Sequence, residues 1–386
     1  MRHIRWWRSW NRRAAWQRRV LALAALAALS PTLAGCWDNR PVDARDLVLA
    51  IGVSPAPHND VTVSLAVPTS AGLISGTSPG SGAGGGSSGQ STYLLQGTGP
   101  DLGAAIAMAQ AYTNKDIYLG QTQLVLFSHR LDATQFGHAV SWLARLGPFD
   151  KTAYAAVAEA PVAKTLGYQP VSTRIGPMYF LTLFSCTHCQ TANLARTLWS
   201  LEMRTVSPGM SIWLPAIDTR GPNFVVRRVV VFRGNTAVAT LSPSQTLALC
   251  YLMAATSKAT LSVSTPAGRV GVRAVRASRF NSVTWSHGRL HVHVTISVMA
   301  AIDQLAEGAV NPAIVLDVED AVSRRIARQT TKVMALLQRR GSDPEAYGPS
   351  VFWNWPALRP HWLAIYRRAV LSVSVSTVIH NVGDST

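Results

Sequence analysis

The first 36 residues constrain this chain most, because they decide which part of it folds as the mature protein. Residues 1–19 contain seven Arg and no acidic residue, and residues 20–29 are a run of small apolar residues. This order is typical of a secretory signal peptide, and the apolar run is shorter than the roughly 20 residues that span a bilayer. The sequence therefore predicts that residues 1–35 are a leader and that the mature protein begins at Cys36.

The residues just before this cysteine make the prediction more specific. Leu33-Ala34-Gly35-Cys36 has the pattern of a bacterial lipobox, in which the Cys thiol takes a diacylglyceryl group and cleavage leaves that Cys as the new N-terminus. The alternative is an ordinary signal peptide with an accidental cysteine. Because the basic region, the apolar run and the lipobox occur in order, we favour the lipobox and expect Cys36 to be the lipid attachment site.

The charge of the remaining chain limits its partners. Without the seven Arg of the leader, 29 basic and 19 acidic residues leave a net charge of +10. Such an excess suits a protein close to anionic phospholipid headgroups. Nucleic acid is the rival partner of a basic protein, but an exported lipoprotein does not meet the genome. No dense basic stripe with interleaved aromatic residues follows the leader, so we expect no nucleic-acid partner.

The cysteines leave several interpretations open. If Cys36 is lipidated, three cysteines remain, which is an odd number for an exported chain. Cys186 and Cys189 form a C-x-x-C motif, which is compatible with a redox pair, half of a zinc site, a local disulfide, or two small thiols on an apolar segment. A zinc site needs four ligands, and the sequence contains no second C-x-x-C motif that would complete the set.

Two further patterns have both a chemical and a structural interpretation. Gly97, Gly99 and Gly103 form a loose glycine motif between an expected strand and an expected helix, as in a dinucleotide-binding site. Such a site usually follows the first strand of its domain, whereas two strands precede this motif. We interpret the motif as a tight turn. His291 and His293 alternate with apolar residues, which indicates the solvated face of a strand rather than zinc ligands. We therefore predict no catalytic residues, no metal site and no cofactor.

Alternating apolar residues and helix-start signals predict a mixed α/β (α+β) fold. The architecture we expect is multidomain, with mainly antiparallel sheets and packed helices, including one long amphipathic helix near the C-terminus. That helix is predicted over residues 315–340, where Gly341 stops it. The other main elements are strands at 46–53, 60–67, 93–96, 124–128, 153–159, 224–232, 237–241, 259–264, 269–280, 289–301 and 370–380, and helices at 102–114, 133–145, 161–167, 177–203 and 246–254.

Breaks in composition predict the domain organisation. Residues 75–90 are rich in Gly and Ser and should form a flexible loop. Residues 207–222 carry three Pro and two Gly, which indicates a linker. We therefore expect an N-terminal α/β region over residues 36–206 and a C-terminal α/β region over residues 223–386, with room in the latter for a separate middle domain.

Several segments resemble one known family in their order and pattern. They are the lipobox Cys36 followed by Trp37-Asp38-Asn39-Arg40, Ile51-Gly52 in the first strand, residues 119–128, Val231-Phe232-Arg233 with Ser242, and a C-terminal block with Asp343-Pro344, Trp355-Pro356 and Trp362. In these segments the chain resembles the Ger(x)C family of spore germination lipoproteins, the C subunits of germinant receptors. The Gly/Ser-rich segment and the C-x-x-C motif depart from the family pattern.

The resemblance implies a function, although its motifs are structural rather than chemical. Such proteins sit on the outer face of the spore inner membrane, held by diacylglyceryl-Cys, beside membrane-embedded A and B subunits of a receptor for nutrients such as amino acids or sugars. The resemblance implies a three-domain α/β fold and no enzymatic activity, and only Cys36 transfers as a functional residue. An exported enzyme that uses Gly97–Gly103 or the C-x-x-C motif, and a generic solute-binding lipoprotein, are the alternatives.

Overall fold

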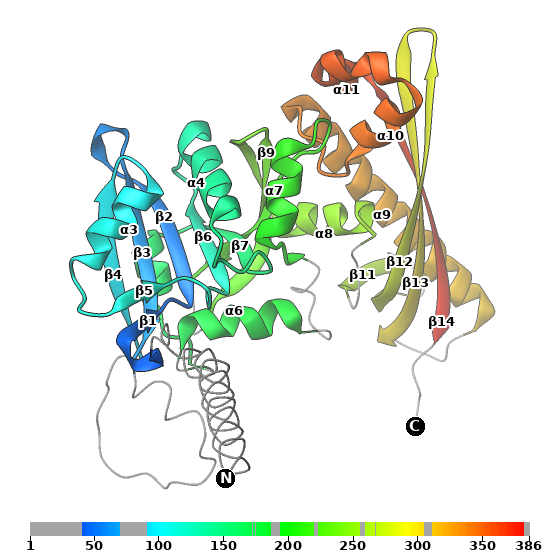
Figure 1. Cartoon of the computed structure of the whole chain (residues 1–386). Coiled ribbons are helices and arrows are strands. Elements are labelled where there is room, and N and C mark those ends of the chain that lie inside the picture. The colour runs from blue at the N-terminus through cyan, green and yellow to red at the C-terminus, as the bar shows by residue number, and fades with distance from the viewer. Residues whose placement is uncertain are drawn as a thin grey trace, which may run out of the picture. The chain divides into compact units, whose positions relative to one another are not determined.

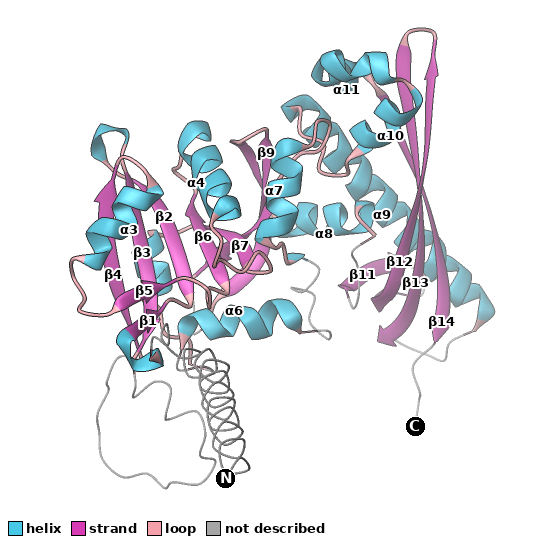
Figure 2. Cartoon of the chain, viewed as in Figure 1, coloured by secondary structure: helices cyan, strands magenta, loops and turns pink. Residues whose placement is uncertain are grey.

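Two β-sheets with packed helices organise the chain, as the computed structural model shows (Figures 1 and 2). The structure describes residues 41–69, 91–171, 173, 175–186, 194–219, 223–254, 259–266, 268–304 and 311–381. The expected leader with its lipobox, the Gly/Ser-rich segment 75–90 and Cys189 lie outside these residues. Residues 46–386 belong to one compact unit, and both sheets are described within it.

The larger sheet has eight strands in the order β10-β9-β8-β7-β6-β2-β3-β4. Its four middle strands, β8, β7, β6 and β2, run parallel, and the strands on either side are antiparallel. The bounds are β2 Ala50–Pro55, β3 Val61–Pro68, β4 Thr92–Gly99, β6 Leu124–Ser128, β7 Tyr154–Ala158, β8 Trp213–Asp218, β9 Val225–Arg233 and β10 Thr236–Leu241. Two short strands, β1 (Arg45–Leu47) and β5 (Asp116–Tyr118), form a separate pair.

Both faces of the eight-stranded sheet are buried, which explains the continuous apolar sequence of β6. Leu124 and Leu126 belong to one apolar cluster, and Val125 and Phe127 belong to the other. A run without polar alternation is typical of a parallel strand covered on both sides. The second cluster contains residues of α3 (Leu102–Gln110), α4 (Ala133–Arg145) and α7 (Leu198–Val206), and the first contains residues of α5 (Val162–Leu166), α6 (Gly176–Ser185) and α8 (Pro243–Leu252).

Helix starts follow the capping chemistry of the sequence. Asp132 caps α4 by accepting hydrogen bonds from the backbone of Thr134 and Gln135, and the Gln135 side chain completes a capping box. Ser242 and Gln245 make the same box at α8, where Pro243 occupies the first helical position. The predicted helix over residues 133–145 is confirmed at both ends, and α8 begins directly after Ser242.

The smaller sheet has four strands in the order β11-β12-β13-β14. The bounds are β11 Ala259–Thr265, β12 Gly268–Ser286, β13 Arg289–Gln304 and β14 Val370–Asn381. The first three strands are antiparallel, and β14 pairs with β13 in parallel. A long helix, α9 (Pro312–Arg340), shares an apolar cluster with one face of this sheet and ends at Gly341, which has a left-handed φ of 67°. Its buried stripe includes Val318, Val322, Ile326, Val333 and Leu337, as an amphipathic helix requires.

A group of short helices connects α9 to β14. It consists of α10 (Tyr347–Asn354), the 3-10 helix η4 (Pro356–His361) and α11 (Trp362–Arg368). This architecture confirms the predicted mixed α/β class, the presence of several sheets with packed helices, and the long C-terminal helix.

Two segments differ from the expected pattern. The segment 207–222, predicted to be a linker, contains β8, whose residues Trp213, Leu214, Ala216 and Ile217 are buried in the sheet. Burial of these apolar side chains outweighs the local break signals of the flanking Pro and Gly residues. The predicted helical segment 177–203 is divided between α6 and α7. The division into an N-terminal and a C-terminal region stays a prediction.

Candidate functional site

The glycine motif lies in the larger sheet and serves close packing between a helix and a strand. Gly97 and Gly99 belong to β4. A Cβ atom on Gly97 would lie 2.0 Å from the carbonyl oxygen of Ala105, and one on Gly99 would lie 2.9 Å from the Cβ of Ala104. Asp101 caps α3, because its Oδ1 accepts a hydrogen bond of 2.9 Å from the backbone N–H of Ala104. The glycines therefore allow α3 to approach β4 closely.

The cysteines and histidines do not meet in a metal site within the described part of the chain. Cys186 is disulfide-bonded, while Cys250 is free and buried, and its burial raises the pKa of the thiol to about 12. The ring nitrogens of His293 hydrogen-bond to the hydroxyls of Ser372, at 2.9 Å, and Ser374, at 3.0 Å. Across the described ranges, no group of three or more His, Cys, Asp or Glu residues is placed to hold a metal ion.

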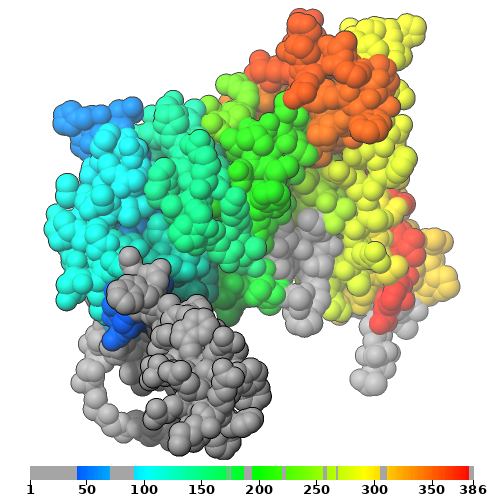
Figure 3. All heavy atoms as spheres, viewed as in Figure 1, coloured from blue at the N-terminus to red at the C-terminus, as the bar shows by residue number. Residues whose placement is uncertain are grey.

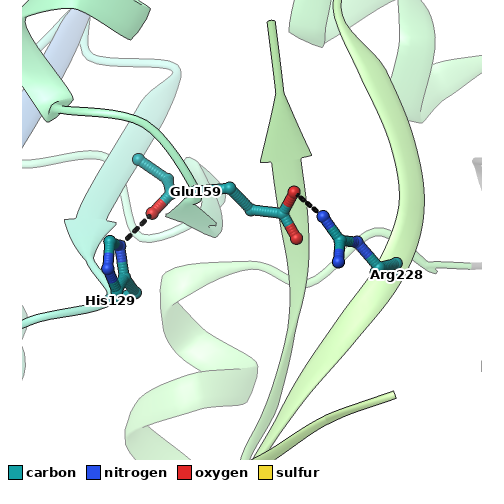
Figure 4. A network of polar contacts seen from close by, with 4 residues as sticks. His129, Glu159 and Arg228 are labelled. Carbon is teal, nitrogen blue, oxygen red and sulfur yellow. Dashed lines mark hydrogen bonds and ion pairs between the residues drawn. The ribbon is translucent and has the colours of Figure 1, made fainter. Parts of the chain in front are cut away.

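A polar network lies at the carboxyl ends of the parallel strands β6 and β7, where ligands bind in open α/β sheets (Figure 4). The Nδ1 atom of His129 hydrogen-bonds to the carbonyl oxygen of Ala158 at 3.1 Å, and Glu159 forms an ion pair with Arg228 of β9. A pocket of 370 Å³ beside this pair is also lined by Asp218 and Arg227. Its described lining contains no Ser, Cys or His side chain, so the pocket offers no recognisable nucleophile, and the ion pair ties the end of β7 to β9.

The turn after α9 forms a polar junction, and we define it as the acidic junction, residues 341–348. It joins the smaller sheet's helix to the larger sheet. The backbone N–H of Ser211 donates to the carbonyl oxygen of Asp343 at 2.8 Å, and the N–H of Asp343 donates to Ser211 Oγ at 2.8 Å. Arg204 of α7 donates to the carbonyl oxygens of Ser211, at 2.8 Å, and Pro344, at 3.0 Å.

The two carboxyl groups of the acidic junction are buried, at 2% exposure for Asp343 and 3% for Glu345. Burial raises the pKa of Asp343 to about 7, although backbone N–H groups and Arg204 oppose the shift. Burial, together with the charge of Asp343, raises the pKa of Glu345 to about 8. Burial also lowers the pKa of Arg204. Burial therefore favours the protonated, neutral form of both carboxyl groups.

Close backbone contact reinforces the acidic junction. A Cβ on Gly209 would lie 2.6 Å from the Cα of Gly348, and a Cβ on Gly348 would lie 2.4 Å from the Cα of Gly209. Nearby, Ser342 Oγ donates a 2.6 Å hydrogen bond to the carbonyl oxygen of Phe232 in β9. The sequence did not predict the buried acids, because a single Asp or Glu in a turn is normally exposed to solvent. Asp343-Pro344 entered the sequence analysis only as one segment of the family resemblance.

The described helices include none that is both long and apolar enough to cross a membrane. Cys36, the site residue that the sequence predicts, lies outside the described residues, and its lipidation stays a prediction.

Comparison with known proteins gives two matches that follow one another along the chain. Residues 38–219 match a family model described as the spore germination protein N-terminal domain, and residues 227–383 match one described as spore germination B3/GerAC like, C-terminal. The two matches meet between β8 and β9, so both contribute strands to the eight-stranded sheet.

The fold is similar to that of a solved structure, the crystal structure of the GerBC protein. The TM-score is 0.57 at 12% sequence identity, and the likeness covers 86% of this chain and 97% of that chain. At this identity the likeness concerns the fold alone. None of the curated protein sequences compared with the chain matches it.

Proposed function

We propose that this chain, which belongs to the Ger(x)C family of spore germination proteins, is the lipid-anchored C subunit of a nutrient germinant receptor. Family membership gives the chain a role in spore germination. In the proposed form of that role, it acts by protein contacts at the outer face of the spore inner membrane, beside membrane-embedded A and B subunits. The observation that carries the proposal is the match of both family models over most of the chain, which follows the lipobox at Cys36.

The lipid anchor has a physical purpose in this proposal. Attachment to a membrane raises the effective concentration of a neighbouring membrane protein to about the millimolar range, so weak contacts become sufficient. The chain then needs surfaces and a fixed architecture rather than a reactive centre. The polar groups described above support this view, because Arg204 and the backbone of Asp343 join parts of the fold, and Glu159 is paired with Arg228.

The first test is the anchor itself. Cys36→Ala should leave an unprocessed or poorly retained precursor, because the thiol that accepts the diacylglyceryl group is lost. Mass spectrometry of membrane-extracted wild-type protein should show the lipid, including its palmitate-type acyl chains, on Cys36. Cys250→Ala is the matched control, since it removes a thiol that is buried in α8, and it should leave lipidation unchanged. A free, unmodified Cys36 in the membrane fraction would contradict the proposal.

The second part of the test concerns the response of spores. Deletion of the gene should abolish germination with particular nutrients and leave other triggers effective. The anchored chain should restore the response and should co-purify with a multi-span membrane subunit, whereas the Cys36→Ala chain should rescue poorly. If the chain instead turned over a substrate, and a change at Gly97 or Cys186 removed that activity, an exported enzyme would replace the receptor subunit. Tight binding of one free solute without any membrane partner would favour a solute-binding lipoprotein.

A further inference from the structure

The helical cap, which we define as α10, η4 and α11 (residues 347–368), has an outer surface that packing within the chain leaves uncovered. Tyr347, Val351 and Tyr366 are buried and fix the cap to the core. Trp353 follows Val351 by two positions, so it projects from the other side of α10, and it is 88% exposed. Leu363 of α11 is 41% exposed. The cap therefore presents a large aromatic side chain to its surroundings.

Contacts within the cap fix the backbone that carries Trp353. The rings of Phe352 and Trp362 meet edge to face at 5.4 Å, and Trp362 stacks on Tyr366 at 5.6 Å. Gln338 of α9 donates to the carbonyl oxygens of Tyr366, at 3.0 Å, and Ala369, at 2.6 Å. Both helices of the cap are thus tied to each other and to the end of α9. Figure 3 shows the cap, in orange, at the surface of the molecule.

The charge of the cap has one sign. Arg359, Arg367 and Arg368 are exposed on it, and Arg339 and Arg340 are exposed at the end of α9. The turn at Gly341 brings the two groups together, because a Cβ there would lie 3.2 Å from Arg367 Nε. No Asp or Glu occurs from residue 346 to residue 381, and the two acids that precede this range in the sequence, Asp343 and Glu345, are buried. The surface is therefore complementary to a negatively charged partner.

We propose that the cap lies against an anionic phospholipid surface, with Trp353 at the level of the headgroups and the arginines beside the phosphates. Trp is enriched at membrane–water interfaces, and a basic side chain near an anionic bilayer raises partitioning by about fivefold. A protein interface would surround a central Trp with a broad apolar patch. None of the exposed neighbours of Trp353 in the sequence, which are Ser350, Asn354, Pro356 and Ala357, has a large apolar side chain, and this suits a single interfacial anchor.

This inference rests on the proposed function only in that both place the chain at a membrane. The lipid on Cys36 would hold the chain near the bilayer, whereas the cap would fix which surface of the fold faces the lipid. The two contacts use different residues, so each can fail without the other.

The test uses a fluorescent label on the full chain, reconstituted into vesicles. Asn354→Cys, labelled with nitrobenzoxadiazole, should show blue-shifted emission and quenching by spin-labelled lipid in vesicles of phosphatidylcholine with phosphatidylglycerol. In vesicles of phosphatidylcholine alone the change should be much smaller. The matched control is the same label at Tyr112→Cys, which replaces an exposed residue far from the cap in sequence and should report water in both vesicles. Labelling of the unchanged chain in parallel corrects for reaction at native cysteines.

Two variants in the labelled chain complete the test. Trp353→Ala should reduce quenching at position 354, and Arg359→Gln with Arg368→Gln should reduce its dependence on phosphatidylglycerol by about tenfold or more. Because these side chains are exposed, the thermal midpoint should stay unchanged, which separates lost contact from lost folding.

Three outcomes would overturn the inference. The label at position 354 would behave like the label at position 112, or it would respond equally to neutral and anionic lipid, or it would change only when the membrane subunits are reconstituted as well. The last result would assign the cap to an acidic protein surface. Acylation of Cys36 is measured in the same sample. An acylated Cys36 without a fluorescence change at position 354 rejects this inference alone, and an unmodified Cys36 with such a change rejects the lipid anchor alone.

Discussion

Strand β6 of the eight-stranded sheet and strand β13 of the four-stranded sheet bury their side chains in different ways. In β6, Val125 and Phe127 enter one apolar cluster while Leu124 and Leu126 enter the other, so neither face meets solvent. In β13, every second residue from Leu290 to Val298 is buried, and the residues between them are polar. The parallel middle of the larger sheet needs helices on both faces, whereas the smaller sheet has α9 on one face only.

This difference in burial predicts how well each sheet tolerates amino-acid substitutions. On the open face of the smaller sheet, hydroxyl and imidazole side chains of β13 and β14 pair across the strands, as between Ser297 and Ser376 at 3.4 Å. Such exposed hydrogen bonds contribute little to stability, because water replaces them when they are lost. A strand of the larger sheet offers no comparable face, so every side chain of its apolar run should matter.

The largest effect should come from emptying the two-sided strand. Phe127→Ala removes a fully buried ring that packs edge to face against Phe136 at 4.9 Å, and it should lower the free energy of unfolding by about 3–5 kcal/mol. The matched change on the open face, Ser297→Ala, should lower it by about 0.5 kcal/mol or less. Urea unfolding followed by circular dichroism gives both values. Equal losses in the two variants would break the comparison between the sheets.

A smaller effect should come from the closeness of α3 and β4 in the larger sheet. In Gly97→Ala the new methyl group would meet backbone atoms, the carbonyl oxygen of Ala105 at 2.0 Å and the nitrogen of Ala109 at 2.5 Å, so the helix has to shift. We expect a loss of about 1–3 kcal/mol, the usual range for overpacking. Gly147→Ala is the control, because nothing lies within 4 Å of its Cβ position, and it should be neutral or slightly stabilising. A neutral Gly97→Ala would show that the approach is not tight.

A third effect, a change of stability with pH, concerns the acidic junction, where elements of the two sheets meet. The folded chain holds protons on Asp343 and Glu345 up to about pH 7 and 8, whereas unfolded carboxyl groups release them near pH 4. Their contribution to stability is complete below about pH 4 and is lost as the pH rises through the folded pKa values. Stability should therefore fall between about pH 5 and 8.

Glu345→Gln should flatten this fall, because the amide cannot release a proton. Urea midpoints of the variant and the wild-type chain, measured across the same pH window, give the two slopes. A variant whose midpoint differs from that of the wild type by one constant amount at every pH would show that Glu345 does not titrate in the folded chain.

Local signals in the sequence were sufficient for much of this architecture. The start of α4 follows from Asp132 with Gln135, and that of α8 follows from Ser242 with Pro243, because capping satisfies backbone N–H groups through neighbouring residues. The alternation in β13 and the apolar stripe of α9 likewise follow from solvent on one side and a core on the other.

Contacts between distant segments could not be predicted in the same way. Strand β8 was concealed by Pro and Gly in residues 207–222, and its place depends on pairing with β7 and β9. The parallel pairing of β14 with β13 has no sequence signal of its own, because alternation is the same in either direction. Within the candidate site, the burial of Asp343 and Glu345 results from α7 and the segment before β8 covering the turn, which is a property of the assembled fold.

The contact between Gly209 and Gly348 has a consequence for how such chains can evolve. Gly209 lies in the part that matches the N-terminal family model, and Gly348 lies in the part that matches the C-terminal one. Each position leaves room for a hydrogen atom only, so a side chain on either half would push the other away. An exchange of halves between relatives by recombination should therefore yield a folded chimera only when both parents keep glycine here, and the two halves should be inherited together.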